Sequence, residues 1–492
     1  MAKSRSTKAI ILSSGKALTV LVGILSTAVL ARLFTKDDYA TYRQTMLAYT
    51  FAAPFLLMGF NQALYYFLPS EKERPRGVLV ENLLLLASGG LVMTLFLVFG
   101  GNELLAWRFN NPDLATTLLL LAPYPLLMGP LAATGACLMA RDRAGQLAIF
   151  NVLSRIVMLG AVVLPVCVWR TPSVAILGTV VGTALSTGVA LLLMFRACSD
   201  GDWKPAGAGI RSQVRFGVPL GLAGLAGATM LGLDKVMVAA LCPPEEFAVY
   251  INGAMEVPLV GIVIGSVTSV LVVDYVKLLG EGRISEMLAL IRRASTKCAL
   301  ILIPAMVFLL CVAPEFMRFL FGEAYGDSAS PFRIYLLLLP RSIVARGILL
   351  AAGRSRHLFF QQVLALAVNV VFTYYAIGAF GATGAAVATV CTVYLVALPY
   401  QLIVIRSIMG RPVRELFSWG DLLKVAVASA LSGVILLGLR YVLPPSDIVV
   451  LMLGVPVFGL AFIASCNWLR LIKVSELCES VNLLWGKHGR GR

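Results

Sequence analysis

The chain alternates between apolar runs of about 20 residues and short polar segments that hold most of its charged side chains. A helix of about 20 residues crosses the hydrocarbon core of a bilayer, so each run has the length of one crossing. Lipid offers the backbone no hydrogen bonds, and the runs lack the alternating pattern of barrel strands. We therefore predict an all-α polytopic membrane protein with about 14 transmembrane helices. The predicted helices are 9–33, 39–68, 78–100, 114–140, 145–168, 172–195, 213–241, 246–276, 294–313, 329–352, 357–378, 382–405, 421–442 and 447–470.

Lys and Arg set the expected orientation. They are roughly four times as frequent in the segments on the same side as the N-terminus as in those on the other side. Such an excess marks the cytoplasmic side, so we expect a multi-pass protein of a bacterial inner (plasma) membrane with both termini in the cytoplasm. The net charge of +16 is spread over short loops rather than one basic domain, which argues against nucleic acid as a partner.

Two motifs recur about 210 residues apart. Asp37-Asp38-Tyr39-Ala40-Thr41-Tyr42 resembles Glu245-Glu246-Phe247-Ala248-Val249-Tyr250, and Arg143-Ala144-Gly145-Gln146-Leu147 resembles Arg354-Ser355-Arg356-His357-Leu358. The near-equal offsets predict two six-helix lobes related by a pseudo-two-fold axis along the membrane normal, followed by two C-terminal helices. The expected boundaries are 1–196 for the first lobe, 197–212 for a cytoplasmic linker, 213–406 for the second lobe, 407–470 for helices 13 and 14, and 471–492 for a basic cytoplasmic tail.

Charged residues within the apolar runs are the candidate functional residues. A charge at the bilayer centre costs about 2.5–3.5 kcal/mol on insertion scales, so such residues usually face a cavity or a partner. The deep charges are mostly basic, and arginine and lysine suit phosphate oxygens, so we expect a cationic central cavity for an anionic substrate. The candidate substrate-binding residues are Lys16, Arg155, Lys235, Arg341 and Arg346, and the candidate coupling or counter-ion residues are Asp234, Glu256 and Asp274.

The alternative interpretation is that these charges snorkel to the interface or neutralise one another. We prefer it for Arg43, which lies one turn inside the second helix. Arg155 and Arg341 lie too deep to snorkel easily, so we prefer the cavity for them. Glu256 fits equally well as a counter-ion for one of these arginines or as a proton or sodium site. Prolines within the apolar runs can bend helices, and Pro340 is the most suggestive of them, because a kink there would free carbonyls next to Arg341.

Several kinds of chemistry are disfavoured. No G-x-x-x-x-G-K-[ST] loop is present to bind ATP, and two histidines are too few for a histidine-built metal or catalytic site. The predicted outside loops are short, the longest running from about 314 to 328, whereas a glycan polymerase or ligase usually needs a large external loop. We expect no enzyme activity, no metal and no cofactor beyond possible coupling to protons or sodium. The pairs Gly178-x-x-x-Gly182 and Gly261-x-x-x-Gly265 are expected to allow close helix packing.

Three segments carry a family resemblance. They are Leu33-Phe34-Thr35-Lys36-Asp37-Asp38-Tyr39-Ala40-Thr41-Tyr42, Leu233-Asp234-Lys235-Val236-Met237-Val238, and Phe380-Gly381-Ala382-Thr383-Gly384-Ala385-Ala386-Val387-Ala388-Thr389. In order and spacing the chain resembles the oligosaccharide flippase (Wzx-like) family of the multidrug/oligosaccharidyl-lipid/polysaccharide (MOP) exporter superfamily. Ala40 stands where relatives often have glycine.

The resemblance implies a function. It implies alternating access and export of undecaprenyl-pyrophosphate-linked oligosaccharide units for O-antigen, capsule or exopolysaccharide assembly. Its candidate partners are membrane lipids, a polysaccharide polymerase and a chain-length regulator. It also implies a role in transport for Asp234 and Lys235. The alternatives are a multidrug or cation antiporter of the same superfamily, a lipid II flippase, and, from another class, a membrane glycan polymerase or ligase.

Overall fold

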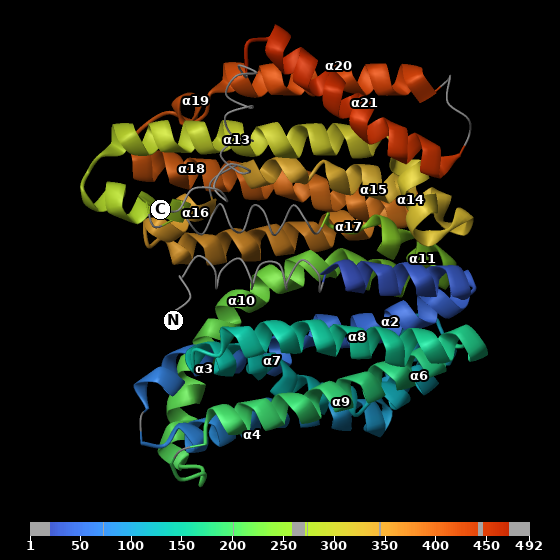
Figure 1. The fold of residues 1–492 in the computed structure, drawn as a ribbon, viewed down its shortest axis with the longest axis vertical. Coiled ribbons are helices and arrows are strands. Elements are labelled where there is room, and N and C mark those ends of the chain that lie inside the picture. The colour runs from blue at the N-terminus through green and yellow to red at the C-terminus, as the bar shows by residue number, and fades with distance from the viewer. Residues whose placement is uncertain are drawn as a thin grey trace, which may run out of the picture. The chain divides into compact units, whose positions relative to one another are not determined.

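The computed structural model describes residues 20–71, 73–199, 201–257, 271–272, 274–343, 346–440 and 446–471. All regular elements in these residues are helices, which confirms the predicted all-α class (Figure 1). Among them, eight helical segments are long and apolar enough to cross a membrane, or up to nine if the bent pair α6–α7 is one span. The predicted total of fourteen is not confirmed. Lys16 and most of the predicted C-terminal tail lie outside the described residues.

The chain forms two compact units. The first comprises Met1–Ala254 and Gln362–Thr389, and the second comprises Met255–Gln361 and Val390–Arg492. The main helices of the first unit are α2 (Lys36–Leu57), α3 (Phe60–Ser70), α4 (Pro75–Phe96), α5 (Asn102–Arg108), α6 (Asp113–Leu121), α7 (Tyr124–Ala140), α8 (Ala144–Trp169), α9 (Pro172–Ala197), α10 (Gly207–Leu241) and α11 (Pro244–Gly253). Those of the second are α13 (Ile284–Cys311), α14 (Ala313–Phe321), α15 (Ala329–Leu336), α16 (Arg346–Ala351), α18 (Leu398–Met409), α19 (Val413–Leu416), α20 (Trp419–Arg440) and α21 (Asp447–Trp468), while α17 (Ser355–Thr392) has residues in both.

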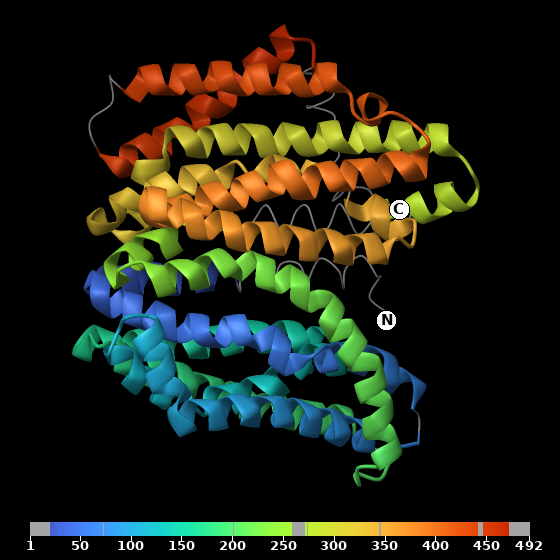
Figure 2. The ribbon, with the colours of Figure 1, turned by 180° about the vertical axis from the view of Figure 1, so that it is seen from behind.

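The predicted helix 39–68 is broken in the middle. Met58 and Gly59 both have positive φ, at 40° and 72°, which ends α2 and starts α3 in a new direction. Helix α10 passes this break closely, because a Cβ on Gly59 would lie 2.8 Å from the Gly217 carbonyl oxygen. Figure 2 shows α10 running beside α2 within the first unit. Glycine at this crossing removes the side chain that would keep the two backbones apart.

A buried carboxylate explains why α10 begins at Gly207 rather than at the predicted 213. Glu81 is 1% exposed and accepts a hydrogen bond from the Ala206 backbone N–H, at 2.9 Å, where α10 starts. Arg74 lies 3.3 Å from the same carboxylate, and Gln213 donates to its other oxygen. Acceptors at a helix N-terminus satisfy free N–H groups and suit the helix dipole. Glu81 therefore anchors the start of α10 to α4.

Two other predicted helices are also divided. The run 246–276 is not continuous, because α11 ends at Gly253 and residues 254–257 are not helical. The run 329–352 is split into α15, a 3₁₀ turn at Leu339–Ile343, and α16. Pro340 lies in that turn, where its missing N–H and its ring prevent a continuous α-helix. The predicted kink beside Arg341 is therefore confirmed.

Glycine permits close packing in the first unit, as predicted for one of the two pairs. A Cβ on Gly178 would lie 2.1 Å from the Ala161 carbonyl oxygen, and one on Gly182 would lie 3.1 Å from the Ala161 Cβ. Helices α8 and α9 therefore approach at their backbones. Gly261 and Gly265 lie outside the described residues.

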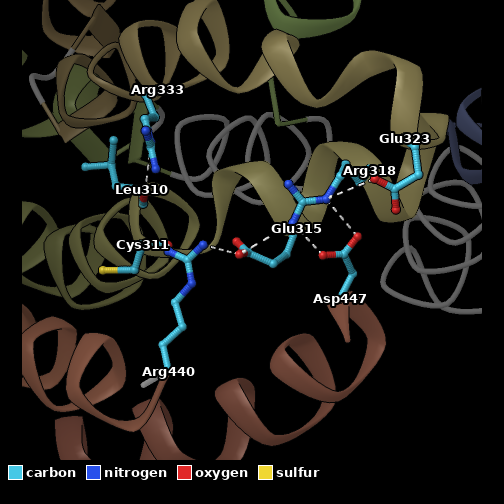
Figure 3. Close-up of polar contacts among 8 residues, drawn as sticks. All are labelled: Leu310, Cys311, Glu315, Arg318, Glu323, Arg333, Arg440 and Asp447. Carbon is cyan, nitrogen blue, oxygen red and sulfur yellow. Dashed lines mark hydrogen bonds and ion pairs between the residues drawn. The ribbon is translucent and has the colours of Figure 1, made fainter. Parts of the chain in front are cut away.

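An ion cluster fixes the last two helices to α14 within the second unit (Figure 3). Arg318 on α14 donates two hydrogen bonds to Asp447 at the start of α21, at 3.0 and 2.6 Å. Arg440 at the end of α20 donates to Glu315 on α14, whose side chain is 5% exposed. The pKa of Arg318 is raised because Asp447 accepts these bonds, so the pair stays charged. Both ends of the α20–α21 hairpin connection are thus held on one short helix.

Candidate functional site

The predicted charges of α10 form a buried pair in the first unit. Asp234 is 1% exposed and accepts a 2.6 Å hydrogen bond from the Tyr250 hydroxyl of α11. The Lys235 ammonium lies 3.6 Å from the other oxygen of Asp234, and its side chain is 20% exposed. A buried carboxylate needs such partners because removing it from water is costly. Adjacent residues on a helix are expected to point in different directions, yet Lys235 lies beside Asp234 here, and Tyr250 is a further partner of that carboxylate.

The two copies of the repeated motif meet at α2 and α11. The buried Tyr39 hydroxyl donates to the side-chain oxygen of Asn252, at 2.6 Å. The Arg43 guanidinium lies 5.7 Å from the centre of the Tyr39 ring and 3.4 Å from its hydroxyl. Arg43 is thus held by the ring and the hydroxyl of Tyr39.

These residues form one group, which we call the α2–α10–α11 polar cluster. Its members are Tyr39, Arg43, Asp234, Lys235, Tyr250 and Asn252. The group contains two basic residues and one acid, so it carries a formal excess of positive charge. Hydrogen bonds between buried groups are strong where water is excluded, and they hold helices in one arrangement. The cluster can therefore both fix α11 against α2 and attract a negative group to Lys235.

Arg341 and Glu256 form a second charged site, in the second unit. The guanidinium Nη2 donates to the Glu256 carboxylate at 2.8 Å. The Arg341 side chain is 31% exposed and that of Glu256 is 58% exposed, in contrast to the buried Glu315 of the α14 cluster. Glu256 lies on the non-helical residues 254–257, just after α11. The structure thus pairs the two residues that the depth argument had placed near the middle of the membrane.

The backbone around Arg341 is held by a tyrosine. The helix break leaves the Leu337 carbonyl outside the helical ladder, and the Tyr394 hydroxyl donates to it at 2.5 Å. Tyr394 itself lies in a π-helical turn at Val393–Ala397. Such turns are rare and are frequent at functional sites. Tyr394 therefore supports the short 3₁₀ turn that carries Arg341.

The other predicted site residues are not brought into these two sites. Arg155 is exposed on α8, lies close enough to Tyr124 for an electrostatic interaction, and has no ion pair among the described residues. Asp274 is exposed in the helical stretch 274–280 and likewise has no described ion pair. The backbone of Arg346 starts α16, but its side chain is outside the described part of the chain, as is Lys16.

Sequence reasoning missed four uncharged residues of the two sites. They are Tyr39, Tyr250 and Asn252 of the α2–α10–α11 polar cluster, and Tyr394 beside the Arg341 turn. The repeat itself was a usable signal for two of them, because Tyr39 and Tyr250 belong to the matching motifs. No comparable signal marks Asn252 or Tyr394. A single polar residue in an apolar run becomes informative only when its partner is known.

Comparison with known proteins gives one matching family and several similar folds. Residues 29–330 match a family model described as polysaccharide biosynthesis protein. A search of curated proteins found no match. The structure is similar to the lipid II flippase MurJ in an inward closed conformation, with a TM-score of 0.75 and 15% identity over 94% of this chain and 99% of that chain.

Two further structures are similar. One is a multidrug resistance MATE family transporter of the MOP superfamily in an inward-facing conformation, with a TM-score of 0.64 and 14% identity over 80% of this chain and 96% of that one. The other is a MOP superfamily transporter from Pyrococcus furiosus described as having a binding pocket of reverse polarity, with a TM-score of 0.57 and 15% identity over 81% and 94%. The chain therefore has the fold of MOP-superfamily transporters, a multi-pass membrane fold.

Proposed function

The chain belongs to a family of polysaccharide biosynthesis proteins, and from that premise we propose that it is a flippase for lipid-linked glycans. We propose undecaprenyl-pyrophosphate-linked oligosaccharide units as the substrate, moved across the bacterial inner membrane by alternating access. The product would enter O-antigen, capsule or exopolysaccharide assembly, with a polysaccharide polymerase and a chain-length regulator as partners. In this proposal the protein is a transporter with no reaction of its own.

The observation that carries the proposal is the half-exposed Arg341 at a break in its helix. Its side chain is 31% exposed, and it lies in the short 3₁₀ turn between α15 and α16 rather than in a buried structural cluster. A deep arginine is expensive in a membrane unless it faces water or a partner. Its planar set of donors matches phosphate oxygens in pairs. Lys235, 20% exposed beside Asp234, is the matching cation of the first unit.

A cation-coupled antiporter is the second candidate, and Asp234 favours it. Asp234 is 1% exposed and accepts a hydrogen bond from Tyr250, and carboxylates buried in membrane proteins often mark ion pathways. Its neighbour Lys235 opposes a second positive charge at that place. Lys235 therefore counts against a cationic substrate at Asp234, and the flippase remains the first candidate.

Deletion of the gene distinguishes the two candidates. A flippase mutant should lose its surface glycan and accumulate single lipid-linked sugar units on the cytoplasmic side, measured by mass spectrometry of extracted lipids. An antiporter mutant should instead become drug-sensitive while its glycan stays normal, and that result would reject the proposal.

Complementation then tests the site. Restoring the gene as Arg341→Gln should lower glycan export roughly 10-fold or more, since a charge-assisted hydrogen bond contributes about 1.5–3 kcal/mol. Arg108→Gln is the matched control, because Arg108 is exposed at the end of α5. Equal export by the two variants, at equal protein levels in the membrane, would remove Arg341 from the site.

A further inference from the structure

Arg341 has unused hydrogen-bonding capacity. A guanidinium carries five N–H donors, and the described residues offer this side chain one acceptor, the Oε1 atom of Glu256. Arg318 in the α14 cluster makes two hydrogen bonds to one carboxylate instead. Arg341 is therefore joined to Glu256 through a single nitrogen. The paired N–H groups of the guanidinium, which could bind two oxygens of one anion, are not occupied by Glu256.

The exposure of the two side chains suits an exchange of partners. Glu256 is 58% exposed, against 5% for Glu315 and 17% for Asp447. Under the proposed function this surface faces a water-filled cavity, and an exposed carboxylate there loses little when it leaves the pair, because it keeps most of its hydration. A buried carboxylate such as Glu315 would lose its cationic partner without regaining contact with water. Glu256 is thus a partner that another anion can replace.

The backbone that carries Glu256 and the backbone that carries Arg341 both differ from a regular α-helix. Glu256 follows the end of α11 on residues without helical hydrogen bonds, and Arg341 lies in the 3₁₀ turn after the break at Leu337. Among the described residues, the Arg341 side is braced by the 2.5 Å hydrogen bond from Tyr394 to the Leu337 carbonyl. The cation is therefore held in place, while its acidic partner is attached to irregular backbone.

We propose that Glu256 is a displaceable counter-ion, which neutralises Arg341 in the empty protein and is replaced by the phosphate groups of the lipid-linked substrate, with Tyr394 positioning Arg341 for that exchange. This inference rests on the proposed function. The pair lowers the cost of keeping a cation deep in the membrane between transport events. A pyrophosphate brings two negative groups and can engage the guanidinium in pairs, so it competes with a carboxylate bound through one oxygen.

Binding to the purified full-length protein tests the exchange, with undecaprenyl pyrophosphate as the probe and undecaprenol, which has no phosphate, as the blank. Glu256→Gln keeps the shape of the side chain but removes its charge, so it should tighten binding about fivefold or more. Arg341→Gln should weaken binding at least tenfold, and the double variant should match Arg341→Gln, since there is no cation left to release. Glu323→Gln is the control, because Glu323 is 86% exposed and 3.6 Å from a different arginine.

Each outcome bears on one claim. If Arg341→Gln weakens binding but Glu256→Gln does not tighten it, the counter-ion exchange is wrong and the proposed function stands. If the unmodified protein binds undecaprenyl pyrophosphate no better than undecaprenol, the proposed function itself fails. If inorganic pyrophosphate displaces the lipid probe at an equal concentration, the site recognises a free anion, and the lipid-linked substrate is overturned.

Tyr394→Phe tests the positioning role separately. Removing the hydroxyl frees the Leu337 carbonyl and should shift the Arg341 donors out of alignment with paired phosphate oxygens. We expect the preference for undecaprenyl pyrophosphate over undecaprenyl monophosphate to fall several-fold, which a general loss of folded protein would not cause. Tyr375→Phe, on an exposed tyrosine, is the control. An unchanged preference in Tyr394→Phe would rule out positioning by this hydroxyl.

Discussion

Tyr39 illustrates how much one buried hydroxyl can determine. It donates to Asn252, whose side-chain nitrogen has no hydrogen-bond partner among the described residues. In Tyr39→Phe the whole amide of Asn252 would be left without a partner, which costs about 1–3 kcal/mol. We therefore expect this variant to unfold at a lower temperature than the unmodified protein in the same detergent.

The control for Tyr39→Phe is Tyr375→Phe, because Tyr375 is 72% exposed. It loses the same atom from a side chain that is not buried, so its unfolding temperature should stay within error of the unmodified protein. Equal shifts in the two variants would mean that the Tyr39–Asn252 hydrogen bond contributes nothing to stability.

At this scale the sequence drew attention to Arg341 and Glu256, which the structure pairs, but not to the neutral residues around them. Arg341 and Glu256 stand out in apolar runs because a charge there needs an explanation. Tyr394 and Asn252 do not, since hydroxyl and amide side chains are ordinary in membrane helices and their importance depends on which atom lies within about 3 Å. That distance is a property of the folded chain and cannot be obtained from hydropathy.

At the scale of helices, hydropathy located the spans but not their interruptions. The predicted 145–168 and 172–195 agree closely with α8 and α9, because both are uninterrupted apolar runs. The breaks at Met58–Gly59 and after Gly253 were missed. Single polar residues such as Gln62 and Glu256 lie near these breaks but do not interrupt the long apolar runs, and the first break depends on how closely α10 passes. Pro340 was the exception, because proline alters the backbone directly.

The contact of α8 with α9 leads to a prediction with an internal control. Gly178→Ala would place a Cβ 2.1 Å from the Ala161 carbonyl oxygen, so the helices must separate. Gly188 lies on the same helix, and its added Cβ would meet nothing within 4 Å. We expect Gly178→Ala to lower the free energy of unfolding by about 1–3 kcal/mol, as overpacking does.

Gly188→Ala should leave that free energy unchanged or raise it by up to about 1 kcal/mol, since alanine favours helix more than glycine. Thermal unfolding in detergent, followed by circular dichroism, measures both variants. If the two substitutions have the same effect, α8 and α9 are not in backbone contact at Gly178.

For the whole molecule, the distribution of Lys and Arg predicts which side each loop faces. A fluorescent protein that matures only in the cytoplasm should fluoresce when fused after residue 201 or at the C-terminus. The same fusion after residue 326, in the segment predicted to lie outside, should stay dark. A dark C-terminal fusion would contradict the predicted even number of crossings. Fluorescence from the fusion after residue 326 would contradict the predicted outside position of that segment.

The α14 cluster has a consequence for the order of synthesis. Glu315 and Arg318 leave the ribosome 125 and 129 residues before Arg440 and Asp447, the partners they hold in the finished protein. Until then Arg318 has only the longer contacts with Glu315, at 3.7 Å, and Glu323, at 3.6 Å, among the described residues, and Glu315 lacks the hydrogen bond from Arg440. The last hairpin therefore completes this ion cluster. A stop codon placed just after residue 440 would release a chain in which Arg318 lacks Asp447, the carboxylate that binds its guanidinium in the complete protein.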